Sequence, residues 1–320
     1  MPQESNMTAE SFQVQLKKQL NNEDEIDLRD LFMALWQGKL WIIGITIIAA
    51  ALSVAFALSQ PNIYRAEALL VADQGGSSGL ANLAAQYGGL AGLAGISLPA
   101  GEIDKKAIGI AKLRSHQFIA KFVQRHDILP DLMAVTNYDS NTGELGYNLE
   151  IYDPIAEIWI SDATPSLQAE PSLQEASTIF QGILGVTEDF QTGFVSISIE
   201  HISPIIAYQW ATWLVDDLNQ EMMLEAVDEA QQSINYLTEQ LASTQVVALE
   251  QVFYSLIEEQ MKTIMLANSR SEYLFKTIDP AIVEETKAGP NRAFICILGT
   301  LFGGILGVIW ALVRRYAFSN

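Results

Sequence analysis

Two long uncharged segments near the ends of the chain most constrain its fold. Residues 40–58 and 293–313 are rich in Leu, Ile, Ala and Val and contain no Asp, Glu, Lys or Arg. Each segment is long enough to cross a hydrocarbon core of about 30 Å as an α-helix. The sequence therefore predicts a membrane protein with two transmembrane helices.

A signal peptide is the alternative for the first segment. It fits poorly, because 39 residues precede the apolar run and the run is long for such a peptide. Basic residues flank the outer sides of both segments, which predicts that both termini are cytoplasmic. These residues are Lys17, Lys18, Arg29 and Lys39 before the first segment, and Arg314 and Arg315 after the second.

The spans divide the chain into five parts. We expect a cytoplasmic segment at 1–39, spans at 40–58 and 293–313, a periplasmic domain at 59–292 and a cytoplasmic tail at 314–320. The cytoplasmic segment is predicted to contain an amphipathic helix at the membrane surface, because its apolar residues recur at helical spacing. They are Leu28, Leu31, Phe32, Leu35 and Trp36.

The domain between the spans is predicted to be α+β. A hairpin is expected because apolar and polar residues alternate in 194–200 after a Gln-Thr-Gly turn. The remaining elements follow from apolar patterning and from turn residues. We expect strands at 62–72, 184–190, 193–201 and 274–278, and helices at 104–127 (broken near Ser115) and 168–181.

A Gly/Ala/Leu-rich segment, residues 75–101, contains no charge. It is predicted to be an apolar loop rather than a solvated linker. A loop of this kind needs a partner surface, either lipid or another subunit. Its large apolar residues are Leu80, Leu83, Leu90, Leu93, Ile96 and Leu98.

A long helix is predicted from Pro204 to Ala242. Ser203 is a suitable N-cap and Pro204 suits the first helical position. At about 1.5 Å per residue this helix would be about 58 Å long, too long for a compact domain to enclose, so it should project from the membrane. Alternating steps of three and four predict a helix-packing seam. The seam residues are Val227, Ala230, Ile234, Leu237 and Leu241.

A second helix at 246–267 should follow a bend at Ser243 and Thr244. Together 204–267 would form a long helical extension. We expect the seam to contact this following helix, around Val252 and Leu256, more than the same helix in a neighbouring subunit.

Three glycines recur every four residues in the second span: Gly299, Gly303 and Gly307. Such spacing clears one helix face so that another helix can approach closely. The partner could be the first span, where Ala49, Ser53 and Ala57 share the spacing, or a neighbouring subunit, or another membrane protein.

Composition excludes several functions. The 38 acidic and 18 basic residues give a net charge of −20, which argues against binding nucleic acid. The single cysteine, Cys296, excludes a disulfide framework within the chain, and the three scattered histidines indicate no metal site. We predict no cofactor and no catalytic residue.

The acidic residues cluster between His126 and Met261, where 23 Asp and Glu occur without a Lys or Arg. Most are expected to face water. Asp216 and Asp217 form a carboxylate pair, but adjacent helical residues point about 100° apart. We therefore expect a solvated face there rather than a glycosidase-like site.

Five motifs of this chain are characteristic of one family. They are IDLRDLFMALWQGK, TGFVSISIEHISPIIAYQWATWLVDDLN, QVFYSLIEEQMKTIMLA, EYLFKTIDPAIVEE and GPNRAFICILGTLFGGILG. With them the chain resembles the Wzz polysaccharide co-polymerases, which are chain-length determinants of lipopolysaccharide O-antigen. The 75–101 segment and the approach to the second span, with Glu284, Glu285 and a single Pro290, depart from the usual pattern.

The resemblance implies a non-enzymatic protein that forms ring-like homo-oligomers in the bacterial inner membrane, in contact with membrane lipid. It implies action with the Wzy polymerase on an undecaprenyl-linked glycan. Alternatives are a co-polymerase for capsule, exopolysaccharide or enterobacterial-type common antigen, a tyrosine autokinase, and a periplasmic sensor or adaptor. No G-x-x-x-x-G-K-[ST] motif supports the kinase.

The expected topology can be tested with reporter fusions. A reporter that is active only in the periplasm should work when fused after Gly143 and fail when fused after Asn320, because the flanking charges place both termini inside. The reverse pattern of activity would contradict the topology.

Overall fold

The computed structural model describes residues 28–72, 105–160, 170–244 and 246–318, which form two compact units. One unit combines residues 1–60 with 290–320, and the other comprises residues 61–289. The predicted 75–101 loop, most of the N-terminal segment and residues 168–169 of a predicted helix lie outside the described residues.

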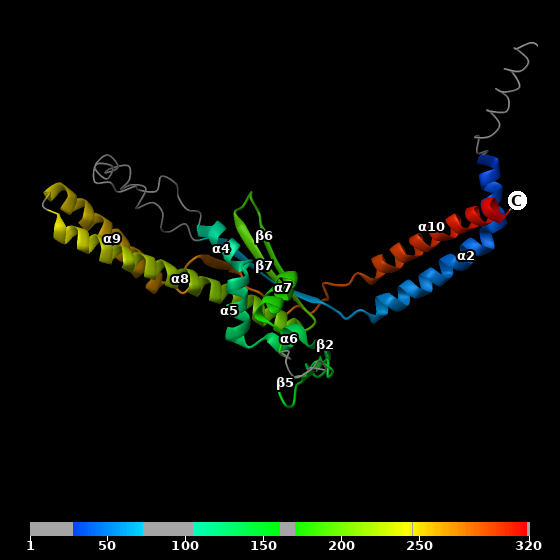
Figure 1. Cartoon of the computed structure of the whole chain (residues 1–320), viewed down its shortest axis with the longest axis horizontal. Coiled ribbons are helices and arrows are strands. Elements are labelled where there is room, and N and C mark those ends of the chain that lie inside the picture. Colours follow the sequence, from blue (N-terminus) through cyan, green and yellow to red (C-terminus); the bar gives the residue numbers. More distant parts are fainter. Residues whose placement is uncertain (1–27, 73–104, 161–169, 245, 319–320) are drawn as a thin grey trace, which may run out of the picture. The chain divides into compact units, whose positions relative to one another are not determined.

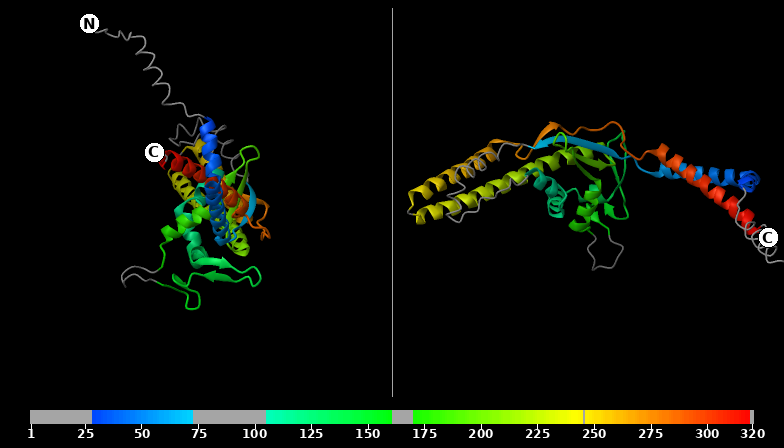
Figure 2. Two further views of the ribbon diagram at one scale, coloured as in Figure 1. Left: turned by 90° about the vertical axis from the view of Figure 1, so that its right-hand side faces the viewer. Right: turned by 90° about the horizontal axis from the view of Figure 1, so that it is seen from above.

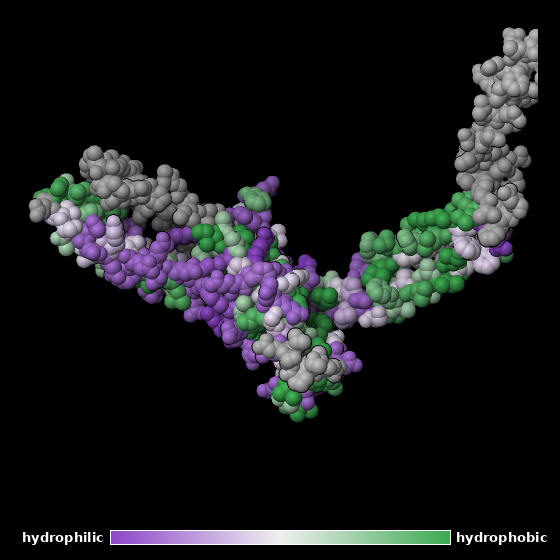
Figure 3. Space-filling model, viewed as in Figure 1, coloured by the Kyte–Doolittle hydropathy of each residue, from purple (hydrophilic) through white to green (hydrophobic). Residues whose placement is uncertain are grey.

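The first unit consists of two long apolar helices, α2 (Leu28–Ser59) and α10 (Arg292–Phe318), which pack side by side (Figure 1). Residues 38–59 of α2 and 292–314 of α10 are long and apolar enough to cross a membrane. Their surfaces are predominantly hydrophobic (Figure 3). The predicted amphipathic segment and the first span form a single uninterrupted helix, α2.

The glycines of α10 face α2 within the same chain. A Cβ added at Gly299 would collide with the Ser53 side chain, and one added at Gly303 would collide with Ala49. At Gly307 the nearest atom would be the Ile42 Cα, at 3.0 Å. The glycines thus let the two backbones approach closely, as small residues do between membrane helices.

The second unit is built on a four-stranded antiparallel sheet with strand order β6-β7-β1-β8. Alternate residues of the central strands are buried, so one face of the sheet forms the core. In register, Ala66, Ala68 and Leu70 lie opposite Ile199, Ile197 and Val195. The strands are β1 (Tyr64–Ala72), β6 (Leu184–Glu188), β7 (Phe194–His201) and β8 (Phe275–Asp279).

Helices cover the apolar face of this sheet. The first part of α8 contacts β1 and β7, α7 contacts β6 and β7, and α5 packs on α7 (Figure 2). At the centre of the core, the buried Trp210 ring lies 5.8 Å from the ring of Phe180. The helices are α4 (Lys105–Leu113), α5 (His116–His126), α7 (Leu173–Ile183) and α8 (Pro204–Ser243).

Serine caps fix where three of these helices begin. Ser115 caps α5 by accepting a hydrogen bond from the Phe118 amide, which explains the predicted break between α4 and α5. Ser172 caps α7 in the same way, so this helix begins at Leu173, later than expected from the sequence. Ser203 caps α8 directly before Pro204, as predicted.

A small region between the helices was not predicted from the sequence. It contains a short helix and two two-stranded ladders, β2 with β3 and β4 with β5. Strands of two to four residues carry too little periodicity to be recognised. The elements are α6 (Leu129–Met133), β2 (Val135–Tyr138), β3 (Leu145–Tyr147), β4 (Tyr152–Asp153) and β5 (Ile158–Trp159).

The predicted long extension is an antiparallel helical hairpin. The 40-residue helix α8 is about 60 Å long at about 1.5 Å per residue, and it continues past the sheet with α9 (Val247–Ser269) alongside (Figure 1). After α9 the chain returns to the sheet as β8, as expected. The predicted bend is present: α8 ends at Ser243, and Thr244 is its C-cap.

The packing of α2 on α10 can be tested with neighbouring glycines. Gly303→Ala should lower the midpoint of thermal unfolding of the full-length protein in detergent, because the new methyl group meets Ala49. Gly304→Ala is the matched control, since its nearest neighbour would be the Thr46 hydroxyl at 3.8 Å. Equal midpoints for the two variants would contradict this packing.

Candidate functional site at the root of the helical hairpin

The candidate site is the part of α8 where the helix leaves the sheet and begins to pack against α9, at the root of the helical hairpin. Within the described residues, no group of three or more His, Cys, Asp and Glu side chains could hold a metal ion. The polar side chains that gather at this junction instead connect α8 to α4, to α5 and to the chain that follows α9. The arrangement is therefore suited to fixing the direction of a helix.

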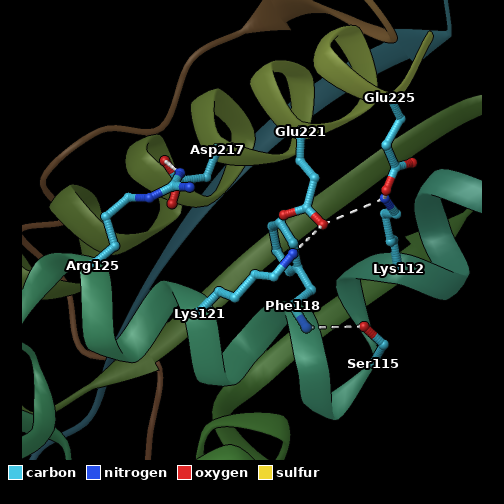
Figure 4. A network of polar contacts seen from close by, with 8 residues as sticks. All are labelled: Lys112, Ser115, Phe118, Lys121, Arg125, Asp217, Glu221 and Glu225. Carbon is cyan, nitrogen blue, oxygen red and sulfur yellow. Dashed lines mark hydrogen bonds and ion pairs between the residues drawn. The ribbon is translucent and has the colours of Figure 1, made fainter. Parts of the chain in front are cut away.

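A row of ion pairs joins α8 to the two helices beside it (Figure 4). The acidic residues Asp217, Glu221 and Glu225 recur every four residues, so they lie along one face of α8. Arg125 Nη1 lies 2.9 Å from Asp217 Oδ1, and Lys121 Nζ lies 3.1 Å from Glu221 Oε1. Three successive turns of α8 are thus held by cations on other helices.

Lys112 bridges two of these carboxylates. Its Nζ contacts Glu225 and lies 3.5 Å from Oε1 of Glu221. Lys112 is the last-turn basic residue of α4, so the row spans both α4 and α5. The Lys112–Glu221 pair is largely shielded from solvent, with side chains 18% and 16% exposed, whereas the Glu225 side chain is 55% exposed. An exposed contact contributes only about 0–1 kcal/mol, so the Glu225 end of the row aligns the helices more than it stabilises them.

Asp217 differs from its neighbours because it is buried, with 7% of its surface exposed. Besides Arg125 it contacts His126, whose Nε2 lies 3.1 Å from Oδ2. The His126 ring stacks on Trp213 with centroids 4.5 Å apart. Removing a partner from a buried carboxylate is costly, because the charge remains without compensation.

The expectation of a solvated Asp216-Asp217 pair is therefore wrong for Asp217. The two carboxylates do have separate environments, as their helical spacing predicted. Asp216 has a raised pKa, because of partial burial and the nearby charges of Asp217 and Glu272. Asp217 and Glu221 are exceptions to the expected exposure of the acidic residues, and their cations come from earlier in the chain, whereas Glu225 is exposed as expected.

Asn219 connects α8 to the start of β8. Its side-chain oxygen accepts hydrogen bonds from the backbone amides of Leu274 and Phe275, at 2.9 and 2.8 Å. Its amide nitrogen donates to the Phe275 carbonyl at 2.9 Å. Because Asn219 is 2% exposed, water cannot replace these bonds. This side chain thus fixes the position at which the chain returns from the hairpin.

His201 closes the other end of the buried part of α8. The Ser203 amide donates to Nδ1, so the proton of the neutral ring lies on Nε2 and is donated to the Asp131 carbonyl. Burial lowers the pKa of His201 below its usual 6.5. This neutral histidine connects β7, the start of α8 and α6.

The residues of the predicted seam lie along the distal part of α8. Ala230 and Leu237 are buried, and Val227, Ile234 and Leu241 are partly buried. On α9, Val252 and Phe253 are buried and Leu256 is partly buried. The predicted glycines lie in the other unit, between α2 and α10, so the two sets of predicted residues belong to separate structures.

Sequence reasoning missed Asn219 and the cations of α4 and α5. Asn219 lies directly after Leu218 in the buried half of α8, and an amide among apolar core positions was a signal that it needed partners. Nothing in the local sequence of Lys112, Lys121 or Arg125 indicates a partner about 100 residues away.

The connection through Asn219 predicts a stability effect. Asn219→Ala should lower the free energy of unfolding by about 2–4 kcal/mol, because two buried amides and a carbonyl lose their partner. Urea unfolding of the full-length protein measures this. Asn235→Ala is the control, since Asn235 is exposed on the same helix. Equal losses in both variants would exclude a specific role for Asn219.

His201 predicts a pH dependence. Because the folded state disfavours its protonation, the unfolded state binds more protons, and stability should fall as pH drops through about 6.5 towards the lowered pKa. His201→Gln should remove this part of the slope in urea unfolding measured between pH 7 and 5. An unchanged slope would show that His201 does not titrate in this way.

The sequence model of the Wzz family, described as chain length determinant protein, matches residues 24–126. None of the curated proteins matches the sequence.

Two solved structures match the chain at low identity and low TM-score. A full-length bacterial polysaccharide co-polymerase has a TM-score of 0.40 and 15% identity, with 93% of this chain and 99% of that chain covered. A fragment of WzzB, a polysaccharide co-polymerase from Salmonella Typhimurium, has a TM-score of 0.28 and 12% identity, with 71% and 100% covered. The match at residues 24–126 confirms the resemblance to the Wzz family that the sequence motifs predicted.

Proposed function

We propose that this protein regulates chain length in lipopolysaccharide O-antigen biosynthesis without catalysing a reaction. The observation that carries the proposal is the match of residues 24–126 to the chain length determinant family, which supports a role in polysaccharide chain-length regulation. The O-antigen is our choice among the polysaccharides that such proteins serve. It follows from the motifs around the spans and the long helix.

In this proposal the protein acts in the inner membrane as a homo-oligomer with the Wzy polymerase and its undecaprenyl-linked glycan. The candidate spans would cross the membrane, with both termini in the cytoplasm and residues 61–289 in the periplasm. The flanking basic residues support this orientation.

The helical hairpin offers a physical basis for length control. A rigid hairpin with a fixed direction can hold polymerases or the growing glycan at a defined position, whereas a mobile one cannot. The ion-pair row and Asn219 fix the direction of α8 at its root. The seam between α8 and α9 would keep the distal part straight.

Deleting the gene tests the function. The modal ladder of lipopolysaccharide on a gel should collapse to an unregulated distribution, and the intact gene on a plasmid should restore it. A ladder that is unchanged by deletion would exclude O-antigen regulation. Loss of regulation in a capsule or common antigen instead would identify the alternative glycan.

The hairpin seam predicts a graded effect. Leu237→Asp buries an unpaired charge and removes an apolar side chain that is 9% exposed, so the distal helices should separate while the sheet stays folded. The ladder should show a shifted or broadened mode. Tyr236→Asp is the control, because this adjacent side chain is 59% exposed. A ladder identical to wild type in well-expressed Leu237→Asp would show that the seam does not affect length control.

A further inference from the structure

One face of α9 carries an apolar stripe that no described residue covers. Val247, Tyr254 and Met261 recur every seven residues and Met265 follows four residues later, so they lie on one side of the helix. Their exposed fractions are 75%, 60%, 54% and 70%. At about 100° per residue, this side is nearly opposite the face of Phe253 and Ala267, which are buried. The stripe is therefore separate from the seam.

The chain between β1 and α4 begins and ends beside the root of α9. Ala72, the last residue of β1, pairs with Phe275. Lys105, the first residue of α4, places its Nζ 5.7 Å from the centre of the Tyr273 ring. Residues 273–275 follow α9 after a few residues, since α9 ends at Ser269. The intervening segment, residues 73–104, is thus tethered at both ends next to the stripe.

The tethered segment is long enough to reach the whole stripe. Half of its length, extended at about 3.3 Å per residue, spans about 50 Å. The 23 residues of α9 extend only about 35 Å. A tethered segment also has a high effective concentration at its target, in the millimolar range for short flexible linkers.

Charge favours this segment over a second copy of α9. Glu250 and Glu258 flank the stripe on its two sides, so packing α9 in parallel against the same face of another α9 would bring like charges together. Residues 74–101 contain no charge but six leucine or isoleucine side chains, and their many glycines and alanines permit close approach. Burying each large apolar side chain contributes about 1.5–3 kcal/mol.

We propose that residues 75–101 dock on the α9 stripe of Val247, Tyr254, Met261 and Met265 within the same chain. The docked segment then covers this face of α9 and removes its apolar side chains from water. This interaction is independent of the glycan that the protein serves, so its test does not depend on the proposed function.

Disulfide formation tests the docking directly. In full-length protein with Cys296→Ser, Met265→Cys is combined in turn with Leu83→Cys, Leu90→Cys and Leu98→Cys. Mild oxidation should give a disulfide within one chain, identified by mass spectrometry. Its yield should be severalfold higher than with Gln232→Cys, an exposed control position on α8. Equal yields with the two positions, or dimers linked through Met265→Cys without any product within the chain, would overturn the proposal.

Proteolysis provides a second measurement. Met265→Asp should make thermolysin cleavage within residues 75–101 severalfold faster, because the docked segment is released, whereas Met265→Leu should not. Met265 is 70% exposed in the described residues, so the aspartate leaves the fold intact. Unchanged cleavage would overturn the proposal. Protection that appears only in liposomes and is absent in detergent would assign the stripe to lipid instead, and would also overturn it.

Discussion

The structure of the second unit depends on the continuity of α8. Up to Met222 this helix buries a broad face against the sheet, and beyond it only Ala230 and Leu237 are fully buried. The change from a broad face to a seven-residue spacing is what a helix shows when it passes from a sheet to a single partner helix. Neither proline nor glycine interrupts α8 after its first residue, so the direction set at the sheet is carried to the distal end.

Polar contacts are concentrated where this change occurs. Apolar packing alone would let α8 slide or rotate by small amounts, because the hydrophobic effect has no direction. The three hydrogen bonds of Asn219 and the carboxylates at three successive turns permit one register only. Asn219 and Asp217 are buried and hydrogen-bonded or ion-paired, and buried polar groups that are satisfied in this way specify a unique arrangement. The hairpin is thus oriented by contacts at its root rather than along its length.

Elements with a strong local signal were predictable from the sequence. The serine caps and Pro204 located the helix starts near Ser115 and Ser203. The strict alternation in β7 identified the β-hairpin of β6 and β7. Where the sequence offered more than one possible helix start, the observed boundary differs from the predicted one. The start of α7 moved to Leu173 because Ser172 provides the cap.

The rest of the structure depends on contacts between distant parts of the chain. Nothing local shows that Lys112 meets Glu225 or that Asn219 meets Phe275, because these pairs are set by the fold. The prediction that Asp217 faces water was wrong for the same reason. The glycine spacing of α10 predicted a close helix contact, but only the structure shows that Ser53 and Ala49 of the same chain occupy it.

The two ends of the second unit leave it side by side. The Ile63 amide donates to the Gly289 carbonyl at 3.0 Å, and the Gly289 amide donates to the Ile63 carbonyl at 3.1 Å. Residues 61–289 therefore form an insertion whose entry and exit are joined by a short antiparallel bridge. Lengthening or shortening the helical hairpin would leave this junction unchanged, so relatives of this chain can differ in the height of the hairpin while the connections to α2 and α10 stay the same.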